Sequence, residues 1–210
     1  MTTFLLIRHA VNDWVKTGKL AGWTPGVHLN EDGQAQAAAL GQRLADRPLK
    51  AIYASPLERT METAQAIAAH HDGLAVQSLE AVGEVRYGRW QGEEVKKLVA
   101  RKMWQVIQYV PSRASFPEGE TMRRVQLRAV DALETLAERH PRQMIAVVSH
   151  SDVIKMILAH YLGMHLDLFQ RIVVSPASLS VVELGYGRPF VALVNDTSHN
   201  PPKKPAESEK

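Results

Sequence analysis

Two stretches of the sequence, Leu5-Leu6-Ile7-Arg8-His9-Ala10 and Val147-Val148-Ser149-His150-Ser151, follow one pattern. In each stretch an apolar run of strand length ends in a polar residue, a histidine and a small residue. Ligands of an open parallel sheet bind at the carboxyl ends of its strands. Either histidine alone would more often be structural, but the repeated setting predicts that His9 and His150 meet at a binding site.

The rest of the chain alternates apolar runs of strand length with longer segments of helical period. This alternation indicates an α/β protein built from βα units on a mainly parallel sheet. Helices are expected over 30–47, 55–71, 91–109, 121–140 and 152–162, and strands over 3–7, 50–53, 144–148, 178–184 and 190–194. Asn30 is the predicted N-cap of the first of these helices. Ser55 and Glu58 are expected to form a capping box at the start of the second.

Composition narrows the class of protein. With 210 residues, of which 45% are hydrophobic and 22% charged, the chain fits one globular domain. The net charge is +3, and the scattered basic residues predict no nucleic-acid surface. The absence of cysteine excludes disulfides and thiolate sites. The apolar N-terminal run is too short to span a membrane or to serve as a signal peptide, so we expect a cytoplasmic protein without a membrane partner.

The predicted domain covers residues 1–197. From Ser198 onward the sequence is rich in proline and lysine and offers no apolar anchor. Such a segment cannot bury enough apolar surface to order itself. We therefore expect 198–210 to be a disordered tail.

Two arginines accompany the two histidines. Arg8 precedes His9, and a buried arginine must be paired or directed at an anion. Arg59 lies one turn into a predicted helix, near the end that favours negative charge, although a surface salt bridge with Glu58 or Glu62 is an equal alternative. Together, two guanidinium groups and two imidazoles would form a cage for a tetrahedral dianion, because arginine donors match phosphate oxygens.

A carboxylic acid is available for proton transfer. Glu84 lies in a segment, Gly83–Gly92, that is rich in glycine and aromatic residues. Burial and a nearby phosphate would raise its pKa, as a general acid at neutral pH requires. The nine histidines include no metal-ligand spacing, so we expect neither a metal nor another cofactor.

Five motifs in order resemble the histidine phosphatase superfamily, also called phosphoglycerate-mutase-like, and in particular a bacterial phosphomutase branch. They are Arg8-His9, Ser55-Pro56-Leu57-x-Arg59, Glu84-x-x-Tyr87-Gly-x-Trp90-x-Gly92, Pro117-x-Gly119-Glu120 and Ser149-His150. The resemblance implies a three-layer α/β/α sandwich. It also implies that His9 accepts the phosphoryl group, that Arg8, Arg59 and His150 bind the phosphate, and that Glu84 protonates the leaving group.

The sequence departs from the family pattern around the expected pocket. Ala10 and Ser151 stand where the family usually has glycine, and Ala10 fits only if its φ is negative. The expected substrate contacts are Asn12, Trp23, Tyr87 and Ser151. The ring nitrogen of His9 that does not attack should be held by a hydrogen bond, and a backbone carbonyl in the following loop is the expected acceptor.

Three functions fit these residues: a phosphatase, a phosphomutase and a phosphate-binding protein without activity. A mutase needs basic residues beyond the cage, and Lys96 and Lys97 are candidates, although a solvated helix face also explains them. The presence of His9, Arg59 and Glu84 argues against a binding protein without activity. Mutases of the family place paired arginines before the Pro-Gly-containing loop, and here only Arg113 is nearby, so a phosphatase acting on a small phosphorylated metabolite is favoured. The sequence leaves open which metabolite is the substrate and whether the protein is a homodimer.

Overall fold

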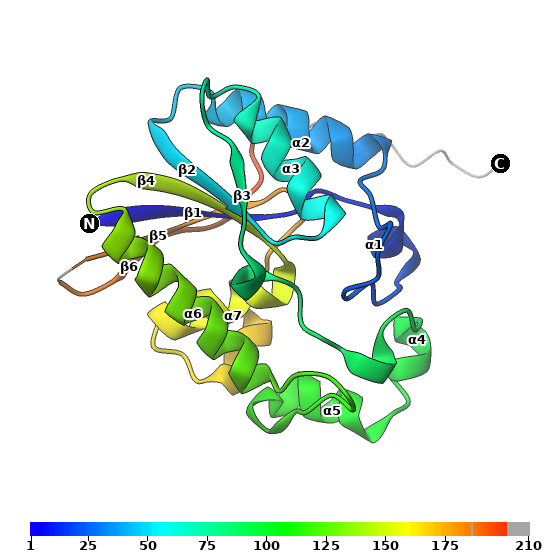
Figure 1. Ribbon diagram of the computed structural model, residues 1–210. Helices are drawn as coiled ribbons and strands as arrows, with labels where there is room; N and C mark the ends of the chain where they lie inside the picture. Colours follow the sequence, from blue (N-terminus) through cyan, green and yellow to red (C-terminus); the bar gives the residue numbers. More distant parts are fainter. Residues whose placement is uncertain (186, 201–210) are drawn as a thin grey trace.

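A six-stranded sheet forms the middle of the computed structural model, which describes residues 1–185 and 187–200 (Figure 1). Its strands are β1 (Thr2–Arg8), β2 (Leu49–Ala54), β3 (Val76–Ser78), β4 (Met144–Ser149), β5 (Leu179–Leu184) and β6 (Phe190–Asp196). The order across the sheet is β3-β2-β4-β1-β5-β6. The first four of these run parallel, β5 is antiparallel to β1, and β6 is antiparallel to β5. The prediction of a mainly parallel sheet is confirmed; the short strand β3 was not expected.

Helices cover both faces of this sheet. The α-helices are α1 (Asp13–Thr17), α2 (Glu31–Leu44), α3 (Glu58–Ala68), α4 (Val95–Leu98), α5 (Lys102–Tyr109), α6 (Met122–Arg139) and α7 (Ser151–Tyr161). Short 3-10 turns lie at Glu80–Val82, Gly88–Trp90, Pro111–Arg113 and Leu166–Arg171. In Figure 1, α2 and α3 lie on one face, and α6 and α7 on the other, which confirms the three-layer α/β/α sandwich. In the described part of the chain, no helix combines the length and apolarity needed to cross a membrane.

The side chains of β1 divide the core into two clusters. Phe4 and Leu6 belong to the cluster that includes the buried residues of α6 and α7, whereas Leu5 and Ile7 pack with those of α2 and α3. Successive side chains of a strand point to opposite faces, and both faces of this strand are covered by helices. This double burial explains the uninterrupted apolar run that precedes Arg8.

Of the two helix caps predicted from the sequence, the structure shows one. The side chain of Asn30 accepts a hydrogen bond from the backbone N–H of Gly33 at 2.9 Å, so its role as N-cap is confirmed. The capping box at Ser55 is wrong. The α3 helix begins at Glu58 with Leu57 as a cap residue that makes no side-chain hydrogen bond. The hydroxyl of Ser55 instead lies 2.8 Å from a ring nitrogen of His150.

The expected helix over 91–109 is two shorter helices, α4 and α5. Leu98 in α4 and Ile107 in α5 are both buried in the core. On one straight helix, at about 100° per residue, two positions nine residues apart would face opposite sides. The break at residues 99–101 therefore allows both side chains to reach the same core cluster.

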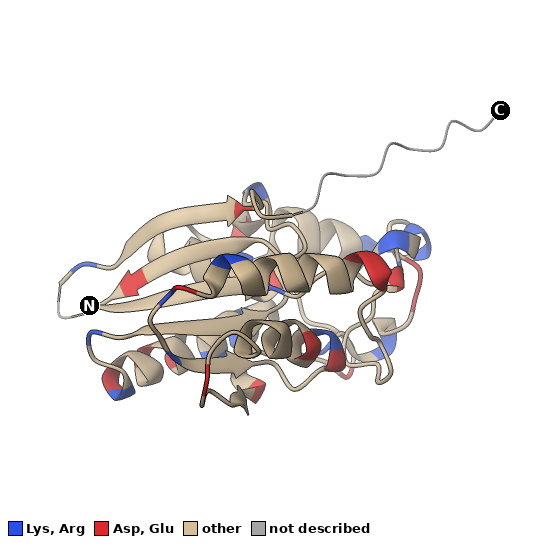
Figure 2. Ribbon diagram, turned by 90° about the horizontal axis from the view of Figure 1, so that it is seen from above, with Lys and Arg blue, Asp and Glu red and all other residues tan. Residues whose placement is uncertain are grey.

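Basic and acidic residues are interspersed along the ribbon, as Figure 2 shows.

The last described residues of the chain contact the domain. Arg43 of α2 donates to the hydroxyl of Ser198 at 3.0 Å, and Nε2 of His199 lies 2.8 Å from the carbonyl oxygen of Ala177. Ser198 and His199, at the start of the predicted tail, thus contact the domain. The rest of the predicted tail, 201–210, lies outside the described residues.

Candidate active site

The two histidines follow neighbouring strands. Arg8 at the end of β1 pairs in register with Ser149 at the end of β4. The next residues, His9 and His150, have ring centroids 5.2 Å apart in an edge-to-face arrangement. The prediction that they meet at the carboxyl ends of parallel strands is confirmed.

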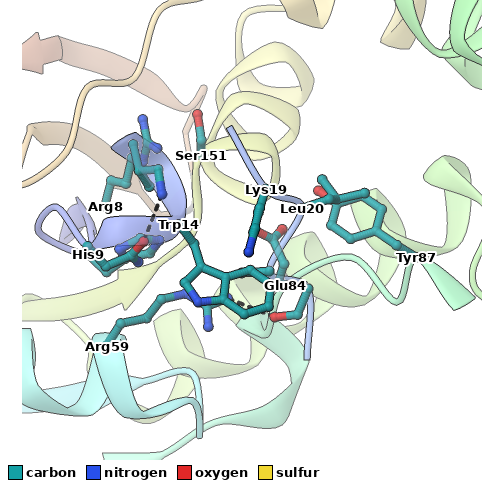
Figure 3. Close-up of a pocket in the computed structure, with 13 residues that line it drawn as sticks. Arg8, His9, Trp14, Lys19, Leu20, Arg59, Glu84, Tyr87 and Ser151 are labelled. Carbon is teal, nitrogen blue, oxygen red and sulfur yellow. Dashed lines mark hydrogen bonds between the residues drawn. The ribbon is translucent and has the colours of Figure 1, made fainter. Parts of the chain in front are cut away.

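A cavity of about 130 Å³ opens beside this pair (Figure 3). It is lined by Arg8, His9, Asn12, Trp14, Val15, Lys19, Leu20, Ala21, Gly22, Arg59, Glu84, Tyr87 and Ser151. Of the site residues predicted from the sequence, all except His150 and Trp23 line it. Lys19 and Trp14 are lining residues that the sequence analysis did not include among the site residues. Their position shortly after β1, Trp14 in α1 and Lys19 just beyond it, was the only signal.

His9 is buried, and its ring orientation is fixed by the backbone. Nδ1 lies 2.7 Å from the carbonyl oxygen of Ala10, the predicted kind of partner. Because a carbonyl can only accept, Nδ1 carries the proton and Nε2 keeps its lone pair. Burial lowers the pKa of His9 well below its usual value, and the charges of Arg59 and Arg8 lower it further. The imidazole is therefore neutral at physiological pH.

Each arginine uses one donor on the protein and leaves another free. Nη1 of Arg8 donates to the carbonyl of Val174 at 2.7 Å, and Nη2 of Arg59 donates to that of Gly22 at 2.8 Å. Nε of Arg8, Nη1 of Arg59 and Nδ2 of Asn12 are buried and have no hydrogen-bond partner among the described residues. Buried donors are almost always paired, so three unpaired donors around one cavity indicate an anion site.

The alternative explanation of Arg59, a surface salt bridge, is wrong. Its side chain is 1% exposed. The two candidate partners are engaged elsewhere: Glu58 accepts from the N–H of Gly26 at 2.9 Å, and Glu62 pairs with His28 and accepts from the N–H of Leu29. Arg59 therefore lies at the cavity.

His150 lies behind the cavity wall. Its Nε2 is 2.8 Å from the hydroxyl of Ser55, and its Nδ1 is 3.4 Å from Nη2 of Arg59 and 3.7 Å from Oε2 of Glu84. Burial is the main reason that the pKa of His150 lies well below its usual value, and Arg59 lowers it further. Ser55 thus contributes a hydroxyl to the site, a role that sequence reasoning missed because a serine before a helix also suits a cap.

Glu84 has the environment of a general acid. The pKa of Glu84 is raised to about 7, mainly by burial and also by the charge of Asp152, while Arg59 opposes the shift. Its Oε1 accepts from the N–H of Val85 at 2.9 Å. Burial, followed by the nearby Glu84 carboxyl, raises the pKa of Tyr87 well above its usual value, so this phenol stays a donor.

The structure does not place Trp23 at the cavity. The indole N–H donates to the carbonyl oxygen of Glu84 at 2.6 Å, and the ring lies against Gly83 on the outer side of that turn. The indole lines a separate surface hollow together with Glu80, Ala81, Arg86, Glu120 and Arg128. The indole is directed away because its N–H finds a partner in the Glu84 backbone.

The two residues that replace glycine fit their positions. Ala10 is not among the non-glycine residues with positive φ, which are Glu118, Arg142, Ala177 and Asn195. The condition for accepting alanine there is met. Ser151 begins α7 and lines the cavity, where its hydroxyl contacts the carbonyl of Val174 at 3.3 Å.

Comparison with protein families gives one match over nearly the whole described chain. Residues 4–197 match the model of the histidine phosphatase superfamily, branch 1. The chain belongs to this superfamily. The resemblance carried by the five motifs is confirmed.

Relatives of this histidine phosphatase include phosphatases. Phosphoserine phosphatase 1 of Hydrogenobacter thermophilus is 31% identical over 201 residues, which cover 95% of this chain and 94% of the relative. Among solved structures, Bacillus stearothermophilus YhfR has a TM-score of 0.89 at 27% identity, covering 96% of this chain and 100% of that one. A phosphoserine phosphatase variant of Entamoeba histolytica, in complex with phosphoserine, has a TM-score of 0.86 at 26% identity, covering 95% and 99%. The chain is a phosphatase of this superfamily.

Proposed function

We propose that this phosphatase hydrolyses a small phosphate monoester through a phosphohistidine on His9. The observation that carries the proposal is the set of three unpaired buried donors, on Arg8, Asn12 and Arg59, that surround the cavity beside His9. A phosphoryl group there would accept hydrogen bonds from all three. Positioning and charge stabilisation of this kind are most of what an enzyme contributes to phosphoryl transfer.

In the first step, Nε2 of His9 attacks phosphorus and the bond to the ester oxygen breaks. The neutral state of His9, with its proton held on Nδ1 by Ala10, supports this role. The proton of Glu84 passes to the leaving alcohol, and the pKa of about 7 leaves a useful protonated fraction at neutral pH. A bound dianion would also favour protonation of His150, which would then stabilise the transferring group.

In the second step, water attacks the phosphorus and the P–N bond breaks, with its electrons returning to Nε2 of His9. Glu84, now a carboxylate, accepts a proton from the water. Inorganic phosphate leaves, and both residues are restored. The small cavity, about 130 Å³, suits a metabolite rather than a large substrate.

Hydrolysis is favoured over mutase action by the position of the lysines. Lys96 and Lys97 both pair with Glu94 on the exposed surface of α4 and do not line the cavity. Lys19 lines its mouth instead, and Figure 3 shows its side chain among the cavity residues. A single extra cation suits one substrate carboxylate better than a second phosphate.

The substrate class follows from Lys19, which is the third cationic side chain at the cavity after Arg8 and Arg59. The ammonium group of Lys19 has no acidic partner among residues 1–185 and 187–200, and it lies 5.6 Å from the centre of the Trp14 ring. We propose phosphorylated amino or hydroxy acids as substrates, with the ester phosphate in the cage and the carboxylate at Lys19. Phosphoserine, on which the first relative is named to act, has this composition.

Trapping the intermediate tests the proposal. Enzyme is mixed with ³²P-labelled phosphoserine, quenched in alkali during turnover, and digested. Label should lie on the peptide with His9, survive base and be lost in acid. His9→Ala should lose both label and turnover while its circular dichroism stays unchanged. Label on a serine or aspartate, or full turnover by His9→Ala, would contradict the mechanism.

A further inference from the structure

The backbone carbonyl of Glu84 accepts two side-chain hydrogen bonds. One comes from Nε1 of Trp23 at 2.6 Å, and the other from Nη2 of Arg128 at 3.1 Å. Trp23 belongs to the loop after β1, and Arg128 belongs to α6. Two distant segments of the chain thus converge on a residue whose carboxyl has a pKa of about 7.

Arg128 fixes the turn on both sides of Glu84. Its Nη1 donates to the carbonyl of Ala81 at 2.6 Å, while Nε and Nη2 donate to the two carboxylate oxygens of Glu120 at 2.9 and 3.0 Å. Glu120 in turn accepts from the backbone N–H of Arg86 at 3.0 Å. A planar guanidinium with several fixed donors holds such a geometry better than an ammonium group can.

Trp23 holds the turn from its outer side. A Cβ atom on Gly83 would lie 2.5 Å from Cζ2 of the indole, so only glycine permits this approach. The guanidinium of Arg86 stacks over the ring, 3.8 Å from its centre. The indole is therefore held between Gly83 and Arg86, with its N–H directed at the carbonyl of Glu84.

We infer that Trp23 and Arg128 are positioning residues that hold the Glu84 carboxyl at the leaving-group oxygen by fixing its backbone. The inference rests on the proposed role of Glu84 as general acid. A general acid must lie within hydrogen-bond reach of the oxygen it protonates. A displacement of about 1 Å can cost on the order of 100-fold in rate.

Two conservative variants separate this role from packing. Trp23→Phe keeps a ring between Gly83 and Arg86 but removes the indole N–H. Arg128→Lys keeps the charge but loses the fork that reaches two carbonyls and a carboxylate. The matched control is Arg89→Met, which removes an exposed ion pair with Glu118 and contacts neither Trp23 nor Arg128 through its side chain.

The measurement is kcat/KM for a series of substituted phenyl phosphates, from phenyl to p-nitrophenyl, which differ in leaving group but hardly in shape. Phenolate needs a proton to leave, whereas nitrophenolate leaves without one. For phenyl phosphate we expect Trp23→Phe and Arg128→Lys to lose about 10- to 100-fold, and for p-nitrophenyl phosphate to change little. Glu84→Gln should show the same selectivity in stronger form, and Arg89→Met should match the parent enzyme.

Two outcomes would overturn the inference. Equal losses across the series would mean that Trp23 and Arg128 act on folding or phosphate binding and not through Glu84, and unchanged rates would mean that neither hydrogen bond matters. If Glu84→Gln itself showed no leaving-group selectivity, the acid role in the proposed function would fall first. Melting curves of each variant distinguish loss of fold from loss of positioning.

Discussion

Oε2 of Glu84 and Nδ1 of His150 lie 3.7 Å apart beside the cavity. Burial raises the pKa of the carboxyl and lowers the pKa of the imidazole, so each side chain is held toward its uncharged form. Both groups can therefore be uncharged before the substrate binds. A bound phosphate dianion would favour protonation of His150 from solvent, and Glu84 would keep its own proton for the leaving group.

The raised pKa of Glu84 has a cost in stability that depends on pH. The folded state binds this proton more tightly than the unfolded chain. The stabilisation that the bound proton contributes to the fold is therefore fully present below about pH 4.5 and is lost as the pH rises to about 7. At 1.36 kcal/mol per pKa unit, the loss is about 3 kcal/mol. Glu84→Gln should therefore melt several degrees higher than the parent at pH 8, and the two should converge near pH 4.

The control for that comparison is Glu138→Gln, which changes an exposed carboxylate near the end of α6. Its melting temperature should differ from the parent by a similar, small amount at both pH values. If Glu84→Gln were less stable than the parent at pH 8, the buried carboxyl would be stabilised in its charged form, and the proposed acid would be wrong.

Lys19 should determine the preference for a substrate with a carboxylate. Lys19→Met is expected to raise KM for phosphoserine about 10-fold, which corresponds to about 1.4 kcal/mol, and to leave KM for p-nitrophenyl phosphate unchanged. Lys16→Met is the matched control, because Lys16 pairs with Asp32 at 2.5 Å and does not line the cavity. If Lys19→Met raised KM equally for both substrates, or if Lys16→Met raised KM for phosphoserine as much as Lys19→Met does, Lys19 would have no part in substrate recognition.

Activity should survive removal of divalent metal ions. The positive charge at the cavity comes from Arg8, Arg59 and Lys19, and such donors can stabilise a transferring phosphoryl group by themselves. Dialysis against a strong chelator should leave kcat for p-nitrophenyl phosphate unchanged. Loss of turnover that is restored by a divalent ion would contradict the cage model.

The last described residues should contribute to stability. His199 contacts Ala177, whose N–H donates to the carbonyl of His9 at 3.3 Å, and Arg43 bridges Asp196 and Ser198. We expect a chain ending at residue 197 to melt about 2–4 °C below one ending at residue 200, as for a loss of about 1 kcal/mol. Equal melting temperatures would mean that these contacts are incidental, as the sequence alone suggests.

Local patterns in the sequence predicted most of the longer elements and the ends of two strands. The apolar runs before His9 and His150, and the cap at Asn30, depend on residues adjacent in the chain, so they can be recognised without a fold. The position of Ser55 depends on a contact with His150 across the sheet. A serine before a helix fits a cap and an active-site hydroxyl equally well, and only the fold distinguishes them.

Trp23 illustrates the same limit at the scale of a loop. Its place after β1 predicts proximity to the site, which is right, but the direction of its ring depends on Gly83 and the Glu84 carbonyl. These partners lie some sixty positions away in the sequence. The break between α4 and α5 likewise allows Leu98 and Ile107 to reach one core cluster. The sequence of 91–109 does not show which of its apolar residues are buried, so it is compatible with one continuous helix.

The placement of β1 between β4 and β5 has a thermal consequence. Amides of a strand bonded on both sides exchange with solvent only when the whole domain opens, whereas the loop with Trp23 and the Glu84 turn can open locally. We therefore expect His9 to stay in place up to the melting transition and the turn that carries Glu84 to loosen at a lower temperature. On warming, the rate of hydrolysis should fall first for esters with poor leaving groups. Esters with good leaving groups should be hydrolysed until the enzyme unfolds.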